Sequence, residues 1–398
     1  MSESSPVPPG TLRGQPSHRV ASLPASGIRR FFDLLASMDN VISLGVGEPD
    51  FVTPLRIRNA GIRSMEEGHT GYTSNFGVLE VREALATHLD RLYGVSYDPA
   101  REIVLTTGVS EGLSIAFLAI LDNGDEVLCS DPCFVAYPPA VVLAGGVFVP
   151  VPTSVENGFR VRAEDLESRI TPRTKAILLG YPANPTGAVM ERDDLLAVAE
   201  VAARHDLFVV SDEIYDRLVY GVQHTCFASL PGMRERTVLL GGFSKTYAMT
   251  GWRLGWAAAR PDVLEAMMKV HQYVMMSAPT MAQYAGLEAL ASGEEDVRGM
   301  VAEYDRRRRL IVSGFNSIGL SCFEPRGAFY AFPSVAVTGL SDEEFAERLL
   351  HEGKVAMVPG SAFGEQGRGY IRACYANSYE NIERALEIVG RFVQSCRR

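Results

Sequence analysis

The chain has 398 residues, a length that accommodates two or three domains of ordinary size. Apolar residues make up 46% of it and charged residues 22%, which excludes a disordered or fibrous protein. With 38 basic and 48 acidic residues the net charge is −10, which argues against nucleic-acid partners and anionic membranes. We therefore expect a soluble protein that acts on small molecules.

The N-terminal residues and the cysteines favour a cytoplasmic protein. Residues 1–20 are rich in Ser and Pro, lack the features of a signal peptide, and are expected to be disordered. The six cysteines form no C-x-x-C pair and have no histidines at zinc spacing, so we expect reduced thiols and no metal site. The longest uncharged stretch, 134–153, contains four prolines and a glycine pair, which excludes a membrane helix.

Short apolar segments alternate with helical segments between residues 100 and 260. Apolar runs with the length of buried strands occur at 103–107, 126–129, 147–149, 176–179, 207–210, 237–240 and 254–259. Segments 110–121 and 191–205 are predicted to be helices. Buried strands separated by helices are typical of a mainly parallel sheet covered on both faces, so the fold class is α/β. Ligands of such sheets bind beyond the carboxyl ends of the strands.

After residue 260 the pattern changes to long helical segments at 261–316 and then to a mixture of short strands and helices. The strands are predicted at 329–332, 355–358 and 370–374, and a final helix carries Ile382, Leu386, Val389 and Val393 on one face. This mixture predicts a second, smaller α+β domain, completed by part of the N-terminal segment. The predicted divisions are a disordered segment 1–20, an N-terminal arm 21–45, a large domain 46–290 and a small domain 291–398.

Four polar segments follow predicted strands: T-G-V-S-E-G at 107–112, Y-P-A-N-P-T-G at 181–187, S-D-E-I-Y at 211–215 and G-F-S-K-T-Y-A-M-T-G-W-R at 242–253. Lys245 follows a buried strand, where desolvation lowers a lysine pKa and favours a Schiff base, although a surface lysine at a helix start is the commoner case. Asp212 fits a cationic ligand nitrogen or a helix N-cap equally well. Taken alone, Asn184 indicates a turn.

The segment T-G-V-S is compatible with a phosphate at a helix N-terminus or with a plain glycine turn and a serine cap. Together, however, a lysine, an acid, a phosphate-binding helix start and an arginine in one parallel sheet have one economical interpretation. Pyridoxal phosphate needs a Schiff-base lysine, an acidic partner for its ring nitrogen and a phosphate site.

In this order, the four segments resemble those of fold-type I pyridoxal-phosphate enzymes, specifically class I aminotransferases. The resemblance runs from about residue 24 to 393 and includes S-L-G-V-G-E-P-D-F at 43–51, G-Y-T-S-N-F-G at 71–77, D-P-C-F-V-A-Y at 131–137, P-R-G-A-F-Y at 325–330, V-P-G-S-A-F-G at 358–364 and Y-I-R at 370–372. The chain is most similar to the prokaryotic aromatic and broad-range subgroup. The resemblance implies a large domain with a mainly parallel, seven-stranded sheet between helices, plus a smaller α+β domain.

The resemblance also implies roles for individual residues. Lys245 corresponds to the lysine that holds the cofactor as an internal aldimine and moves the substrate proton, and Asp212 to the acid that keeps the ring nitrogen protonated. Tyr215 and Asn184 correspond to the pair that binds the cofactor's phenolic oxygen. The implied catalytic residues are Lys245, Asp212 and Tyr215. The implied cofactor-binding residues are Val109, Ser110, Phe134, Asn184, Asp212, Tyr215, Ser244, Lys245, Arg253 and Tyr72.

Within that set, Val109 and Ser110 correspond to the phosphate cradle, mainly through backbone N–H groups, and Ser244 and Arg253 to the remaining phosphate contacts. Phe134 corresponds to the aromatic residue stacked on the ring, although without its flanking motif it is typical of a core residue. Tyr72 corresponds to a tyrosine that reaches the phosphate of the neighbouring subunit, which implies a homodimer with shared active sites.

The residues implied for substrate binding are Arg372, Gly47 and Asn184. Arg372 corresponds to the arginine that binds the substrate α-carboxylate through two hydrogen bonds. A surface salt bridge is the weaker interpretation of Arg372, because the residue lies in the apolar-flanked strand 370–374. Gly47 corresponds to a backbone position that helps to hold the same carboxylate.

Two positions depart from the family pattern. Gly242 stands where many members carry Ser or Thr, so one phosphate hydroxyl is missing, which is tolerated in the aromatic subgroup. Tyr273 stands where strict aspartate enzymes place an arginine for the distal carboxylate, which favours aromatic or broad specificity.

The implied reaction is ping-pong transamination between an L-amino acid and a 2-oxo acid, with 2-oxoglutarate as the expected acceptor. Aspartate remains a possible substrate. Fold alone does not exclude a carbon–sulfur β-lyase or a cyclopropane-forming synthase, which share Lys245, Asp212 and Arg372. A non-catalytic ligand-sensing regulator is the remote alternative, because such proteins carry a DNA-binding domain for which the first 20 residues leave no room.

Overall fold

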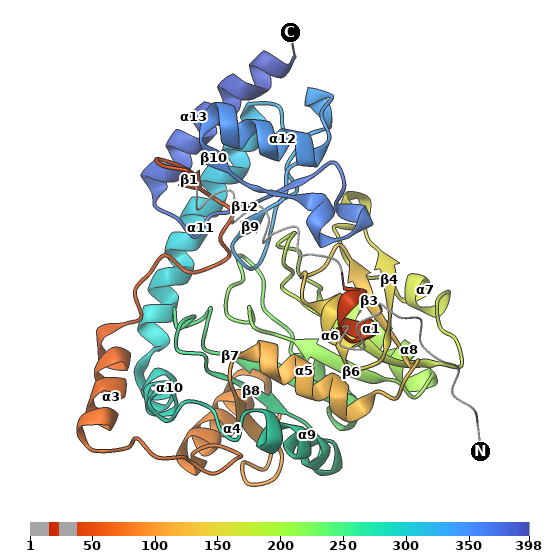
Figure 1. Cartoon of the computed structure of the whole chain (residues 1–398), viewed down its shortest axis with the longest axis vertical. Coiled ribbons are helices and arrows are strands. Elements are labelled where there is room, and N and C mark those ends of the chain that lie inside the picture. Colours follow the sequence, from red (N-terminus) through yellow and green to blue (C-terminus); the bar gives the residue numbers. More distant parts are fainter. Residues whose placement is uncertain (1–15, 24–37, 398) are drawn as a thin grey trace, which may run out of the picture.

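The computed structural model describes residues 16–23 and 38–397, and Figure 1 shows their arrangement. A seven-stranded sheet has the strand order β2-β8-β7-β6-β5-β3-β4. Its strands are β2 (Ile103–Thr106), β3 (Glu126–Asp131), β4 (Val147–Pro152), β5 (Thr174–Leu179), β6 (Phe208–Asp212), β7 (Thr237–Gly242) and β8 (Gly255–Ala258). Neighbours pair in parallel except β8, which is antiparallel to both β2 and β7. The predicted α/β fold with a mainly parallel sheet is confirmed, and each predicted strand is present to within a few residues.

Helices cover both faces of this sheet, which explains why the strands are continuously apolar. Ile103 and Leu105 of β2 belong to the buried cluster that contains residues of α4 (Leu79–Tyr93). Val104, between them, belongs to the cluster of α5 (Val109–Ile120) and α9 (Pro261–Val274). In β6, Val209 shares a cluster with Val198 of α8 (Arg192–Arg204), again on the opposite face from α5. The faces are therefore covered, and the strand ends remain for a ligand.

The helical stretch predicted at 261–316 consists of α9, α10 (Thr280–Ser292) and α11 (Glu294–Ser317). Pro279 lies at the N-cap of α10, and Gly293 separates α10 from α11. Helix α3 (Leu55–Glu66) was not predicted. Its buried residues are Ile57, Ala60, Gly61 and Ser64. The larger apolar residues Leu55, Ile62 and Met65 are exposed, so large apolar side chains do not mark the buried face of this helix in the sequence.

The C-terminal part contains two small sheets. One has the order β11 (Val358–Pro359), β12 (Ile371–Cys374), β9 (Tyr330–Ala331), and in the other β1 (Ile42–Ser43) pairs in parallel with β10 (Val355–Ala356). Helices α12 (Asp342–Arg348) and α13 (Tyr379–Cys396) lie with them, at the top of Figure 1. Helix α11 contacts α10, β9 and α13 and so connects this part with the rest. The pairing of β1 shows that the N-terminal segment contributes to the C-terminal part.

The N-terminal prediction of disorder is wrong for residues 16–20. Residues 18–21 form the short helix α1 (His18–Ala21), in which the Val20 N–H donates to the Ser17 hydroxyl. Arg19 Nη1 donates to the Leu143 carbonyl at 3.1 Å, at the end of α6 (Tyr137–Leu143). Arg19 Nη2 also donates to Asn123 Oδ1 at 3.4 Å. A local cap and these two contacts with the folded part therefore hold this stretch. The remainder of the predicted segment, 1–15, and residues 24–37 of the predicted arm lie outside the described residues.

Helix α6 occupies part of the uncharged stretch 134–153, and β4 occupies its end. No helix within residues 16–23 and 38–397 is both long enough and apolar enough to cross a membrane.

Candidate active site

The predicted site residues gather along one edge of the seven-stranded sheet. Strands β2, β7, β6, β5 and β3 run in the same direction, so their carboxyl ends lie at a common edge. The residues at or after these ends are Val109 and Ser110 (β2), Ser244 and Lys245 (β7), Asp212 and Tyr215 (β6), Asn184 (β5) and Phe134 (β3). Because β8 runs the opposite way, Arg253, just before its first residue, lies at the same edge.

Lys245 is enclosed by backbone and aromatic groups. Its Nζ donates a hydrogen bond to the Gly47 carbonyl at 2.7 Å. The same atom lies 6.0 Å from the ring centre of Tyr215 and 5.7 Å from that of Phe329. Burial lowers the pKa of Lys245 to about 8, because the low-dielectric surroundings disfavour the charged ammonium. A neutral amine at physiological pH is a nucleophile and a proton acceptor.

Asp212 is a buried carboxylate with two donors. Tyr137 donates its hydroxyl to Oδ2 at 2.9 Å, and the Ile214 N–H donates to Oδ1 at 3.2 Å. Burial raises the pKa of Asp212 to about 6, and the Tyr137 hydrogen bond opposes that rise. A cation placed beside this carboxylate would stabilise its ionised form. The site therefore offers a partner for a cationic ring nitrogen.

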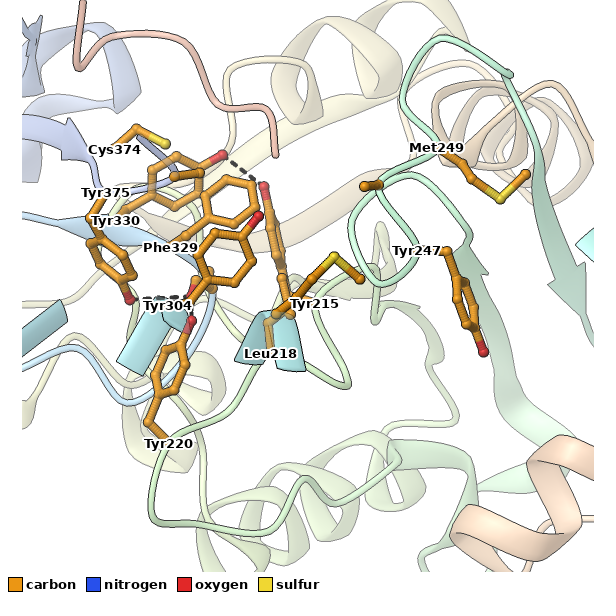
Figure 2. Close-up of a cluster of buried hydrophobic side chains, with 14 of the residues drawn as sticks. Tyr215, Leu218, Tyr220, Tyr247, Met249, Tyr304, Phe329, Tyr330, Cys374 and Tyr375 are labelled. Carbon is orange, nitrogen blue, oxygen red and sulfur yellow. Dashed lines mark hydrogen bonds between the residues drawn. The ribbon is translucent and has the colours of Figure 1, made fainter. Parts of the chain in front are cut away.

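Tyr215 lies in the aromatic cluster shown in Figure 2. Its hydroxyl lies 2.7 Å from the Tyr330 hydroxyl, and its ring makes an edge contact with Phe329. Burial raises the pKa of Tyr215 well above its usual value, so the phenol remains a hydrogen-bond donor. The Gly47 backbone lies close to the phenol of Tyr330, because a side chain at Gly47 would collide with the Tyr330 hydroxyl.

Arg372 is a buried cation, 3% exposed, on β12. Its Nη1 donates to Asn184 Oδ1 at 2.8 Å and its Nη2 to the Gly45 carbonyl at 2.7 Å, while its guanidinium lies over the rings of Tyr330 and Phe363. Its Nε has no partner within the described residues. Since none of these contacts is with a carboxylate, the buried charge remains uncompensated, which favours an anionic ligand here.

The turn before α5 provides backbone donors. Gly108, at its N-cap, has φ +74°, and a side chain there would lie 2.6 Å from Arg253 Nη2. Arg253 is exposed, and its Nη1 donates to the Thr250 carbonyl at 3.0 Å. A helix N-terminus with an adjacent arginine is suited to a phosphate group. Ser244, the residue before Lys245, is buried, whereas Ser110, in the first turn of α5, is exposed.

Tyr72 and Tyr273 lie apart from this group on the surface of the chain, 84% and 87% exposed. The loop that carries Tyr72 is hydrogen-bonded to the segment that follows α9, the helix of Tyr273. Asn75 Nδ2 donates to the Met276 carbonyl at 2.7 Å, and the Thr280 hydroxyl donates to the Gly71 carbonyl at 2.8 Å. The single chain thus unites most predicted residues at the sheet edge and leaves these two tyrosines pointing outward to solvent.

Sequence reasoning named no role for two residues that contact the site. Tyr137 binds Asp212, and Tyr330 binds Tyr215 and underlies Arg372. Both belong to motifs that carry the family resemblance, at 131–137 and 325–330, which is the signal that would have found them. Gly180 leaves room for Tyr137, because a side chain at Gly180 would collide with the Tyr137 hydroxyl.

Comparison with known proteins places this geometry in context. Residues 39–389 match the family model described as aminotransferase class I and II. The Bacillus subtilis (strain 168) protein YugH is 52% identical over 377 residues, which cover 95% of this chain and 98% of that protein. The aspartate aminotransferase of Pyrococcus abyssi (strain GE5 / Orsay) is 45% identical and covers 93% of this chain and 96% of its own length.

Among solved structures, the aromatic aminotransferase from Pyrococcus horikoshii OT3 superimposes with a TM-score of 0.88 at 44% identity. The match covers 92% of this chain and 99% of that structure.

Proposed function

The chain belongs to the family of class I and II aminotransferases, and we propose that it uses pyridoxal phosphate to move an amino group from an L-amino acid to a 2-oxo acid. The favoured donors are aromatic or broad-range amino acids, and the favoured acceptor is 2-oxoglutarate. The observation that carries the proposal is the juxtaposition of a buried lysine of lowered pKa with a buried carboxylate at one sheet edge.

The residues of the site fit this cofactor. The first turn of α5 with Arg253 offers donors to a phosphate, Asp212 offers a carboxylate to the ring nitrogen, and Lys245 offers a nucleophilic amine to an aldehyde. Phe134, after β3, is available to cover one face of the ring. When bound, pyridoxal phosphate supplies an electrophilic carbon and an electron sink for the substrate carbanion.

The protein's own groups then have separate tasks. Lys245 Nζ accepts the proton of the substrate α-carbon and returns it, which its lowered pKa permits near neutral pH. Asp212 holds a proton on the ring nitrogen by ion pairing. Tyr215 and Asn184 donate to the phenolic oxygen, and the Tyr330 hydroxyl fixes the position of Tyr215.

Arg372 orients the substrate. Its guanidinium is fixed by Asn184 and by the Gly45 carbonyl, and its charge lacks a carboxylate among these partners. The α-carboxylate of an amino or oxo acid supplies that missing charge, with a bidentate geometry that lysine does not offer. The Gly47 backbone lies close to the Tyr330 phenol, over whose ring the Arg372 guanidinium lies, so it stands beside the arginine that would hold the carboxylate.

The site is shared between two copies of the chain in this proposal. Tyr72 and Tyr273 are exposed in one copy, as are the apolar residues Val52 and Leu55. A second copy that covers these residues brings Tyr72 to the phosphate of its neighbour. Tyr273, an aromatic residue in place of an arginine, then favours aromatic or broad specificity. The six unpaired cysteines fit the reducing cytoplasm.

A half-reaction experiment tests the function. The purified protein with its cofactor is mixed with single amino acids and no acceptor, and the absorbance of the lysine-bound cofactor is followed. We expect loss of that band and growth of the pyridoxamine phosphate band, fastest with Tyr or Phe. Aspartate ahead of both would overturn the Tyr273 argument, and pyruvate with ammonia in place of the pyridoxamine form would indicate a β-lyase.

Lys245 provides the sharpest single test. Lys245→Ala removes the atom that carries the substrate proton, so we expect transamination to fall by several orders of magnitude, in line with the loss of a covalent and acid–base group. The variant should bind the cofactor only noncovalently, without the absorbance of the lysine-bound form. Full transamination by Lys245→Ala would exclude Lys245 as the catalytic lysine.

A further inference from the structure

Helices α5 and α9 are connected by a buried histidine–glutamate pair close to the phosphate-binding turn. His271, in the last turn of α9, has no exposed side-chain surface, and its Nδ1 lies 2.6 Å from Glu111 Oε1 on α5. The other oxygen, Oε2, accepts the N–H of Thr107 at 2.5 Å. Nε2 of His271 has no partner in the described part of the chain. Within the described residues, Nδ1 therefore makes the only hydrogen bond of the His271 ring, and that bond joins α9 to α5.

This connection determines which backbone donors of the turn remain free. The Thr107 N–H is used by Glu111, and the Gly108 N–H by the Thr106 carbonyl at 2.8 Å. The N–H groups of Val109 and Ser110 have no acceptor within the described residues. Glu111 thus fixes the start of the turn and leaves the next donors available to an anion.

The Glu111 carboxylate can also interfere with anion binding, since it lies in the same helical turn as the Val109 and Ser110 N–H donors. Held by His271 and Thr107, it is a fixed acceptor, but released from His271 it would compete for the Val109 and Ser110 N–H groups and repel a phosphate. We propose that His271 is a positioning residue for the cofactor phosphate, acting by holding Glu111 on the Thr107 N–H. This inference rests on the proposed use of pyridoxal phosphate.

Amide substitutions of His271 separate its two ring nitrogens. The amide nitrogen of asparagine lies near the position of Nδ1 and that of glutamine near Nε2, so His271→Asn keeps a donor for Glu111 and His271→Gln removes it. Helix propensity favours the opposite order of stability, because glutamine is a better helix former than asparagine. A purely structural role therefore predicts that His271→Gln is the better variant, whereas the positioning role predicts that it is the worse one.

The readout is affinity for the apoprotein, measured for pyridoxal phosphate and for pyridoxal, which lacks the phosphate. We expect His271→Gln to bind pyridoxal phosphate about tenfold more weakly, the size expected for one lost hydrogen bond to a charged group. Its affinity for pyridoxal should match that of the unaltered chain. His271→Asn should retain most of the preference for the phosphorylated form. Inorganic phosphate should raise the melting temperature of the unaltered apoprotein and of His271→Asn, but not that of His271→Gln.

A second buried pair provides the matched control. His224 Nε2 lies 2.7 Å from Glu213 Oε2, and both side chains are buried. His224→Asn removes this donor, and we expect the ratio of the two affinities to remain unchanged. If His271→Gln is not recovered folded, His271→Leu, which removes the donor without burying an amide, takes its place in the same comparison.

The outcomes separate this inference from the function on which it rests. An unaltered chain that binds neither compound as a lysine adduct overturns both. An unaltered chain that prefers the phosphorylated compound, with an equal preference in His271→Gln or His271→Leu, overturns only the role of His271. Equal weakening of both compounds also overturns it, since that result indicates a general loss of structure.

Discussion

Burial changes the acid–base behaviour of one residue on which the proposed chemistry depends. The pKa of Lys245 is lowered from 10.5 to about 8, so about a tenth of it is neutral at pH 7, against about three in ten thousand for an ordinary lysine. Because only the neutral amine reacts with an aldehyde, the rate of imine formation by the apoprotein with pyridoxal should rise with pH up to about 8 and level off above it.

Stopped-flow absorbance between about pH 6 and 10 measures this rate, with Lys245→Ala as the control for surface lysines. A rate that continues to rise to about pH 10 would show that the lysine keeps its ordinary pKa and is not desolvated.

At the same scale, the sequence identifies some site residues better than others. Lys245, Asp212 and Asn184 follow apolar strands, so their position at the sheet edge was predictable from the strand pattern alone. The roles of Tyr137 and Tyr330 were not predictable in this way, because a tyrosine among apolar residues is typical of a core. Their contacts depend on how α6 and β9 pack and on the space left at Gly180 and Gly47, which a sequence does not display.

At the scale of elements, strand β8 positions the turn before α5, which is proposed to bind the phosphate, by lying directly against it. A side chain at Gly255, the first residue of β8, would lie 2.6 Å from the backbone carbon of Gly108 and 2.7 Å from the Val109 nitrogen. Alanine normally suits a strand better than glycine. Here a methyl group would collide with backbone atoms of the turn. We therefore expect Gly255→Ala to lower the free energy of unfolding by about 1–3 kcal/mol and to weaken cofactor binding.

Thermal melting of the apoprotein at one fixed protein concentration measures the change. Gly299→Ala is the matched control, because Gly299 lies within α11 with open space around its missing side chain. That substitution should raise stability by about 0.5–1 kcal/mol through helix propensity. Equal melting temperatures for Gly255→Ala and the unaltered chain would mean that β8 and the turn can separate without cost.

Helices α3 and α1 are two elements that escaped sequence reasoning, each for its own physical reason. Helix α3 buries alanine, glycine and serine beside a single isoleucine, and its other large apolar residues, Leu55, Ile62 and Met65, are exposed, so large apolar side chains do not mark its inner face. Helix α1 depends on a contact between Arg19 and the distant Leu143 carbonyl. By contrast, α13 buries a continuous stripe that includes Ile382, Leu386, Val389 and Val393, and it was predicted from periodicity alone.

At the scale of the whole molecule, one chain does not complete the site that its family resemblance implies. The sheet edge gathers the lysine, the acid and the arginines, whereas Tyr72 faces outward in a loop bonded to the neighbourhood of Met276. The site at the sheet edge could be predicted from the strand pattern, because the sheet is formed by one chain. Which residue of a second copy reaches it depends on a surface match that the sequence pattern does not encode.

Mixed dimers test this sharing directly. Lys245→Ala lacks the lysine but keeps Tyr72, whereas Tyr72→Ala keeps the lysine and should bind little cofactor when the cofactor is limiting. If Tyr72 serves the neighbouring site, a mixed dimer contains one site with both residues. Random reassociation of equal amounts forms about one half mixed dimers, so the mixture should recover about a quarter of the activity of the unaltered protein.

The reciprocal mixture has the opposite expectation. A chain that carries both Lys245→Ala and Tyr72→Ala, mixed with the unaltered chain, forms mixed dimers without any complete site, so activity should fall below that of the unaltered chain alone. Activity equal to the sum of the parents in both mixtures would show that Tyr72 acts within its own subunit or not at all. Recovery in the first mixture and loss in the second together require that the tyrosine crosses from one copy to the other.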